Sequence, residues 1–204
     1  MKTDGESWQA RDLSGEDTLR LILDGTGVKA RLDRRVMSVP LLVAVGVRRD
    51  GQKVLLAVKN MGGETQAAWR HVLEDLLARG LKAPELVIVD GGKGLEAALA
   101  SLWSDIPVQR CTVHKEHNLL AHAPKALHDE VKADYTDMMY AENAEDARKK
   151  RKAFLAKWRL RCRGVADSLE GEAAKRTNGE RLFTLPRLSA AAMEVLADHR
   201  QRIR

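Results

Sequence analysis

The sequence has few of the residues that stabilise small secreted proteins or membrane proteins. Only two of its 204 residues are cysteines, Cys111 and Cys162. A disulfide framework is therefore excluded, and a reduced cytosolic setting is the simplest interpretation. No run of about eighteen apolar residues occurs, so we expect no membrane span. Aromatic residues make up only 4% of the chain, so the core must be largely aliphatic. This length predicts one domain, or one domain with an inserted part.

The chain carries 35 Lys and Arg residues against 29 Asp and Glu residues, a formal net charge of +6. A basic balance suits a polyanionic partner such as nucleic acid, although many proteins without such a partner are mildly basic. The most basic stretch begins at residue 148 and contains Lys149, Lys150 and Arg151. These three side chains are candidates for phosphate contacts, and a solvated helix face is an equally good interpretation.

One stretch combines a buried strand, a turn and a helix. The four apolar residues 86–89 end at Asp90, and a glycine-rich turn and a helical pattern follow. In open α/β sheets, ligands bind outside the carboxyl ends of the strands, which is the position of Asp90. Because burying an unpaired carboxylate is unfavourable, we expect Asp90 to be exposed at a site or held by a partner.

A second acid interrupts an apolar run in the same way. Residues 19–23 are mostly apolar and lead into Asp24-Gly25. Taken alone, Asp24 is more simply a turn or helix-capping residue. Together with Asp90 on an adjacent strand, it could hold Mg²⁺ or Mn²⁺, which prefer carboxylate oxygens.

The hydrophobic pattern predicts an α/β fold in the order β-β-β-α-β-α-β, followed by helices. Its first three strands form an antiparallel meander, with a hairpin turn at Asp50-Gly51. We expect a lead-in at 1–17, a core at 18–111 and a helical insertion with a C-terminal part at 112–204, with helices broken near Pro124. The expected strands are 18–31, 39–47, 53–59, 84–89 and 106–111, and the expected helices are 64–79, 94–103 and 144–162.

Cys111 and His114 lie three positions apart after the last predicted strand. A structural zinc site needs four ligands, and no second ligand pair occurs at a suitable spacing. A catalytic cysteine is also weakly supported, because no acid is evident nearby. We therefore favour a small buried residue at Cys111 and a hydrogen-bonded residue at a helix start for His114.

Several segments together resemble the catalytic region of the Mutator-type transposases of bacterial insertion sequences. The resemblance runs from Asp24 to Leu188, and its most specific part is the Cys-x-x-His signature at Cys111 and His114. The segments that carry it are 23–25, 45–55, 60–64, 89–91, 94–95, 107–115 and 118–119.

The resemblance implies a ribonuclease H-like mixed sheet with a helical insertion, and a DDE-type enzyme that cuts transposon-end DNA and joins it to a target. Asp24 and Asp90 match the first two metal-binding acids of the family, so Mg²⁺ or Mn²⁺ is the implied cofactor. Cys111 and His114 would then support the structure near the site. By implication the protein forms a homo-oligomer on DNA and is cytoplasmic, associated with the bacterial nucleoid.

Two features differ from the family pattern. Only some twenty residues precede Asp24, so we expect the N-terminal end-recognition region to be absent. The third acid is either Glu180 or missing, and the better alignment favours its absence. Two functions therefore stay open: a transposase or transposase fragment, and a non-catalytic DNA-binding remnant. A metal-dependent nuclease or phosphatase on the same fold is a weaker third reading.

Overall fold

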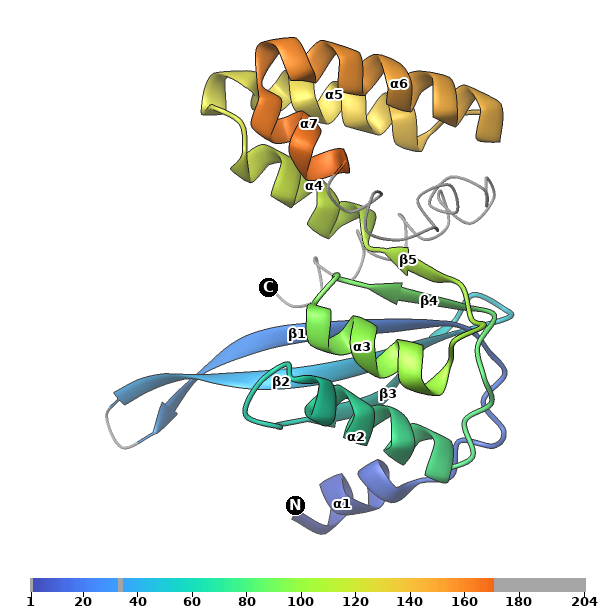
Figure 1. The fold of residues 1–204 in the computed structure, drawn as a ribbon. Helices are drawn as coiled ribbons and strands as arrows, with labels where there is room; N and C mark the ends of the chain where they lie inside the picture. The colour runs from blue at the N-terminus through green and yellow to red at the C-terminus, as the bar shows by residue number, and fades with distance from the viewer. Residues whose placement is uncertain (1, 33–34, 171–204) are drawn as a thin grey trace. The chain divides into compact units, whose positions relative to one another are not determined.

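A five-stranded mixed sheet forms the centre of the first of two compact units, which divide between Arg110 and Cys111. The computed structural model describes residues 2–32 and 35–170. The strand order is β3-β2-β1-β4-β5, as Figure 1 shows. β1 to β3 form the expected antiparallel meander, and β4 and β5 run parallel to β1. The predicted α/β fold class with a mixed sheet is thus confirmed. The strands are β1 Thr18–Leu32, β2 Arg35–Arg48, β3 Lys53–Lys59, β4 Leu86–Val89 and β5 Val108–Arg110.

Helices α2 (Gln66–Ala78) and α3 (Lys93–Leu102) pack on one face of this sheet (Figure 1). The Thr65 side chain caps α2 by accepting a hydrogen bond from the backbone N–H of Ala68. The apolar residues of α2 recur at helical spacing and are buried, and each large one stabilises the fold by about 1.5–3 kcal/mol. They are Ala68, Trp69, Val72, Leu73 and Leu76.

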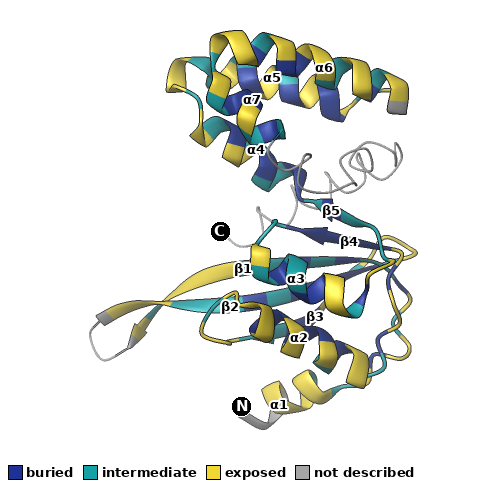
Figure 2. Ribbon diagram, in the orientation of Figure 1, coloured by how far each residue is buried: buried dark blue, intermediate teal, exposed yellow. Residues whose placement is uncertain are grey.

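Side-chain alternation decides which residues of the central strands meet these helices. Leu21 and Leu23 of β1 point into the helix-covered core, as do Val87 and Val89 of β4. All four residues of β4 are buried, as expected for a strand between two parallel neighbours (Figure 2). Asp24 follows Leu23, so alternation directs it away from that core.

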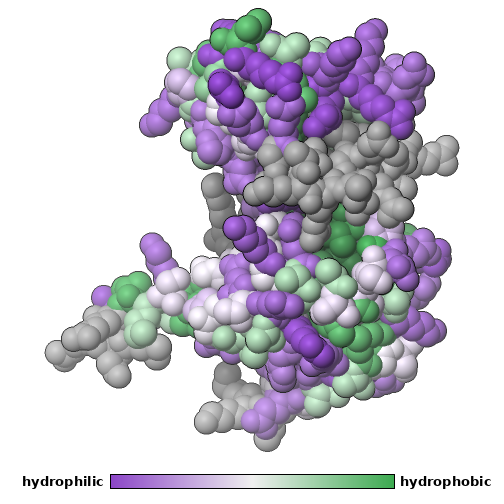
Figure 3. All heavy atoms as spheres, in the orientation of Figure 1, coloured by the Kyte–Doolittle hydropathy of each residue, from purple (hydrophilic) through white to green (hydrophobic). Residues whose placement is uncertain are grey.

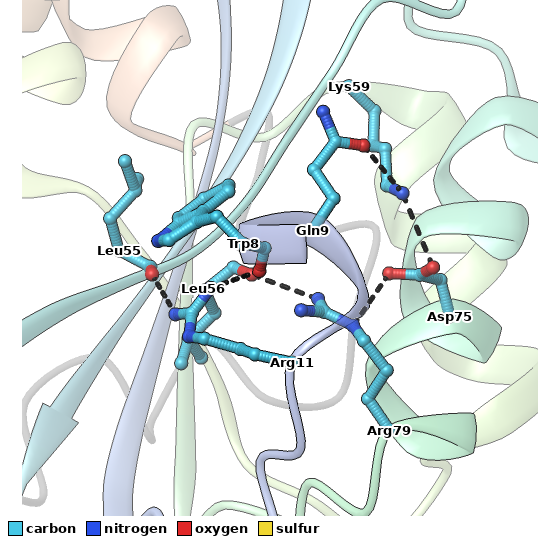
Figure 4. Close-up of polar contacts among 8 residues, drawn as sticks. All are labelled: Trp8, Gln9, Arg11, Leu55, Leu56, Lys59, Asp75 and Arg79. Atoms are coloured by element: carbon cyan, nitrogen blue, oxygen red, sulfur yellow. Dashed lines mark hydrogen bonds and ion pairs between the residues drawn. The ribbon is translucent and has the colours of Figure 1, made fainter. Parts of the chain in front are cut away.

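The segment expected as a lead-in contains helix α1 (Lys2–Ala10), and Arg11, directly after it, ties this segment to the sheet (Figure 4). Arg11 donates to the backbone carbonyl of Leu55, and its guanidinium lies 4.4 Å from the ring centroid of Trp8. Arg79 donates to the carbonyl of Leu56 at 2.9 Å. These side chains therefore satisfy carbonyls on the edge strand β3.

The second unit is helical. A buried Trp158 lies at its centre, and its indole N–H donates to Asp134 at 2.9 Å. The expected break near Pro124 is present, since Pro124 precedes a single 3₁₀ turn, Lys125–Leu127. No helix in the described part of the chain is long and apolar enough to cross a bilayer. The helices are α4 Thr112–Ala121, α5 His128–Met139, α6 Ala144–Arg161 and α7 Arg163–Glu170.

Candidate active site

The sheet brings the two predicted acids to neighbouring positions. β1 and β4 pair in parallel, and their last registered pair is Leu23 with Val89. Asp24 and Asp90 are the next residues on their strands, and neighbouring strands lie about 4.8 Å apart. Both acids are half-buried. The register therefore places two carboxylates side by side where β4 ends.

The turn after β4 is held by backbone and side-chain contacts. The backbone N–H of Gly92 donates to Oδ1 of Asp90 at 2.9 Å, and Arg110 donates to the Asp90 carbonyl at 2.6 Å. Gly91 has φ +96°, and a Cβ there would lie 1.9–2.2 Å from the Arg110 guanidinium. A glycine is thus required at position 91 both by its backbone conformation and by the arginine packed over it.

A third carboxylate reaches this region from the loop before α2. The carboxylate atoms of Glu64 lie 2.1–2.4 Å from where a Cβ on Gly25 would be. The Glu64 backbone carbonyl lies 2.3 Å from the corresponding point on Gly94. Gly25, directly after Asp24, and Gly94, in the first turn of α3, therefore leave the space that Glu64 occupies.

The charges of these groups interact. A Cβ on Gly92 would lie 3.5 Å from both Oδ1 of Asp90 and Oε2 of Glu64, so these oxygens are at most 7.0 Å apart, the sum of the two distances. Partial burial, and then the nearby charges of Asp90 and Asp24, raise the pKa of Glu64. The carboxylates are thus close enough for ionisation of one to disfavour ionisation of another.

Glu64 is a candidate site residue that no local sequence pattern indicates. It lies one residue before the N-cap of α2 and ends no apolar run. Its position depends on contacts with Gly25 and Gly94, which are 39 and 30 positions away in the sequence. The nearest signal was its place in the 60–64 segment that resembles the family, which gave it no role.

Carboxylate oxygens are the donors that Mg²⁺ and Mn²⁺ prefer, so the side chains at this end of the sheet fit such a cation in type and placement. Within residues 2–32 and 35–170, however, no three His, Cys, Asp or Glu side chains are already gathered as a metal-binding group. The fit therefore lies in the type of the donors and in the neighbouring strand positions of Asp24 and Asp90.

Cys111 and His114 lie in the second unit, at the start of α4. Cys111 is a buried free thiol at the N-cap position, and its carbonyl accepts from the backbone N–H of Lys115 at 3.0 Å. Lys115 is itself buried and donates through Nζ to the carbonyl of Ser168 in α7. The Cys-x-x-His signature therefore lies at the start of α4, and the first turn of that helix is hydrogen-bonded to α7 of the same unit.

The basic candidates lie on α6. Lys149 is exposed and Arg151 is half-buried. The Lys150 ammonium lies 2.8 Å from Asp137 and 3.3 Å from Asp146, so its charge is already balanced. A DNA contact by these residues stays a prediction. Glu180, the other candidate acid, lies outside the described residues.

Transposases of insertion sequences are similar to this chain over two thirds or more of its length. The transposase of insertion sequence IS6120 from Mycolicibacterium smegmatis is 37% identical over 153 residues, covering 75% of this chain and 47% of that protein. The transposase of IS256 in transposon Tn4001 from Staphylococcus aureus is 32% identical over 145 residues, covering 68% of this chain and 37% of that protein. The chain thus spans less than half the length of these relatives.

Among solved structures, the catalytic core domain of the HTLV-2 integrase, in complex with magnesium in its trimeric form, is similar over 66% of this chain and 91% of that chain. The sequence identity is 15% and the TM-score is 0.30. The family described as "Transposase, Mutator family" matches residues 2–178, which is most of the sequence. The chain therefore belongs to the Mutator family of transposases.

Proposed function

We propose that this chain carries the catalytic carboxylates of a transposase, which cleaves transposon-end DNA and joins it to a target with the help of Mg²⁺ or Mn²⁺. The observation that supports this most is the parallel register of β1 and β4, which sets Asp24 beside Asp90. Family membership supports the reaction class, because the relatives are named transposases of insertion sequences.

In this proposal Asp24 and Asp90 hold the divalent cation. When bound, such a cation would supply Lewis-acid stabilisation of the charge that develops on phosphoryl oxygens. Arg110 positions Asp90, because it donates to the Asp90 carbonyl and packs over Gly91. Lys93 is exposed three residues after Asp90 and would attract the phosphate backbone of the substrate.

The partners follow from the reaction. The substrate would be double-stranded DNA, both transposon ends and target, and the basic balance of the chain suits it. Pairing of two transposon ends would need more than one copy of the protein, so we propose a homo-oligomer on DNA. Action on the chromosome would place the protein at the bacterial nucleoid.

A cleavage assay tests the proposal. The purified chain is mixed with labelled transposon-end DNA and Mg²⁺ or Mn²⁺, and nicked products are counted. We expect cleavage that is lost in Asp24→Asn and in Asp90→Asn, since each substitution removes a charged donor. Asp105→Asn, an exposed acid of the same unit, is the matched control and should cleave like the wild type.

The outcomes separate the two functions left open by the sequence. Cleavage that survives in both Asp24→Asn and Asp90→Asn would contradict the assigned site. DNA binding without any cleavage, unaltered by either substitution, would instead support a non-catalytic remnant.

A further inference from the structure

β1 and β2 continue well past the rest of the sheet. β4 pairs with β1 as far as Leu23, and β3 pairs with β2 only from Leu42 onward. Beyond these points, seven residues of each strand, 26–32 and 35–41, are paired with one another. Among the described residues, these strand segments have no other strand partner. We call them the β1–β2 arm. At about 3.3 Å per residue it is about 23 Å long, and it projects from the sheet in Figure 1.

The arm has two different faces. Directly paired residues of antiparallel strands share a face. Val28 pairs with Val39 and Ala30 with Met37, so one face is apolar, and its atoms are seen beside the grey tip in Figure 3. The opposite face carries the alternate pairs, Gly27 with Pro40, Lys29 with Ser38 and Arg31 with Val36, and its two charged residues are both basic.

Both faces are open to solvent in this unit. Val28 is 46% exposed, Met37 53% and Val36 64%, and Lys29 and Arg31 are exposed as well (Figure 2). An isolated two-stranded ribbon is at best marginally stable in water, and exposed apolar side chains commonly mark a surface that meets a partner. The arm therefore has the features of a binding element.

The charge of the arm favours a polyanion. Its two strand segments contain Lys29, Arg31 and Arg35, a formal charge of +3. The arm contrasts with α6, where Lys150 is already balanced by Asp137 and Asp146. No Asp or Glu occurs within either strand segment of the arm.

The shape of the arm favours duplex DNA among polyanions. The major groove is wide enough to admit a two-stranded β-ribbon. Basic side chains on one face can contact phosphates, while apolar side chains can meet the methyl groups of thymine.

We propose that the β1–β2 arm binds duplex DNA, with Lys29 and Arg31 contacting the phosphate backbone. This proposal rests on the proposed function, in which DNA is the substrate, and assigns a DNA contact outside the carboxylate site. It assigns a principal DNA contact to the arm of the first unit rather than to the basic helix α6 of the second.

Binding of a fluorescent DNA duplex to the full 204-residue chain, measured by anisotropy over a range of salt without divalent metal, tests the arm. Lys29→Gln/Arg31→Gln should lower the magnitude of the salt slope of log K by about two, since each phosphate contact contributes about one. Affinity at about 0.1 M salt should fall by about tenfold or more. The control Arg70→Gln/Lys82→Gln removes two exposed charges from the same unit and should bind like the wild type.

An unchanged slope and affinity in Lys29→Gln/Arg31→Gln would overturn the proposal, as would a wild-type chain that binds no DNA. If Val28→Ser/Met37→Ser dissociates an oligomer in sedimentation while the charge variant binds DNA normally, the arm is a contact between copies. That result would also overturn the proposal. This binding assay contains no divalent metal and so does not depend on cleavage. Arm-dependent binding here, together with no cleavage in the metal-containing assay, would reject only the catalytic assignment.

Discussion

At the residue scale, the raised pKa of Glu64 makes the stability of the fold depend on pH. Its pKa is raised in the folded protein, so the folded state retains its proton more readily than the unfolded state does. Ionisation of Glu64 as the pH rises through that raised pKa therefore lowers stability. Well below the unfolded pKa, Glu64 is protonated in both states and contributes nothing.

Glu64→Gln is accordingly expected to raise the melting temperature of the metal-free protein at about pH 8 and to have little effect at about pH 3. Thermal unfolding across this range measures it. Glu74→Gln is the control, an exposed glutamate of α2 whose carboxylate lies 2.7 Å from Arg70. A variant less stable than the wild type at about pH 8 would show that burial and neighbouring charge do not disfavour the ionised form of Glu64.

The glycines beside the carboxylates give a second residue-scale prediction. A Cβ on Gly94 would meet the backbone carbonyl of Glu64 at 2.3 Å, and backbone cannot move aside cheaply. Gly94→Ala should therefore lower the free energy of unfolding by about 1–3 kcal/mol, as overpacking does. Gly25→Ala meets only the flexible end of the Glu64 side chain, and its effect in chemical denaturation should be smaller. Equal losses in the two variants would contradict this packing.

The candidate site residues that could be predicted from the sequence are those marked by a local pattern. Asp24 and Asp90 each interrupt an apolar run, and that pattern is visible along the chain without any tertiary contact. Glu64 and Arg110 reach the same region through contacts with glycines distant in sequence, which no local pattern reports.

At the element scale, the packing of helix α6 depends on the side chains of its one buried face. Trp158 is fully buried, whereas Leu160, two residues further on, is 91% exposed. Trp158→Ala should lower the free energy of unfolding by about 3–5 kcal/mol, because it leaves a cavity and removes the hydrogen bond to Asp134.

Leu160→Ala on the same helix should change stability by less than about 0.5 kcal/mol, since it removes no buried contact. Urea denaturation followed by far-UV circular dichroism compares the two variants. Similar losses would mean that α6 is not oriented as described.

The element boundaries were predicted best where side chains are buried. The predicted helix 64–79 is observed as Gln66–Ala78, and the predicted strand 84–89 as Leu86–Val89. The second strand was expected at 39–47 but runs over Arg35–Arg48. Its first residues belong to the β1–β2 arm, where backbone pairing extends the strand without an apolar core to mark it in the sequence.

At the scale of the whole molecule, the chain belongs to a transposase family but corresponds to only part of the length of its relatives. The chain matches the Mutator family over residues 2–178 yet spans less than half of the IS6120 transposase. The described part contains a sheet that holds two acids side by side, an exposed basic arm and a helical unit. The proposed function and the proposed DNA contact rest on the first two of these parts.

The most direct test of the account is the binding of Mn²⁺ to the purified chain, measured by titration calorimetry. We expect saturable binding to the wild type and to Asp105→Asn, with affinity reduced by about tenfold or more in Asp24→Asn and in Asp90→Asn, because each loses a charged oxygen donor. Mn²⁺ binding with wild-type affinity in both of the latter variants would contradict a shared metal site at the ends of these two strands.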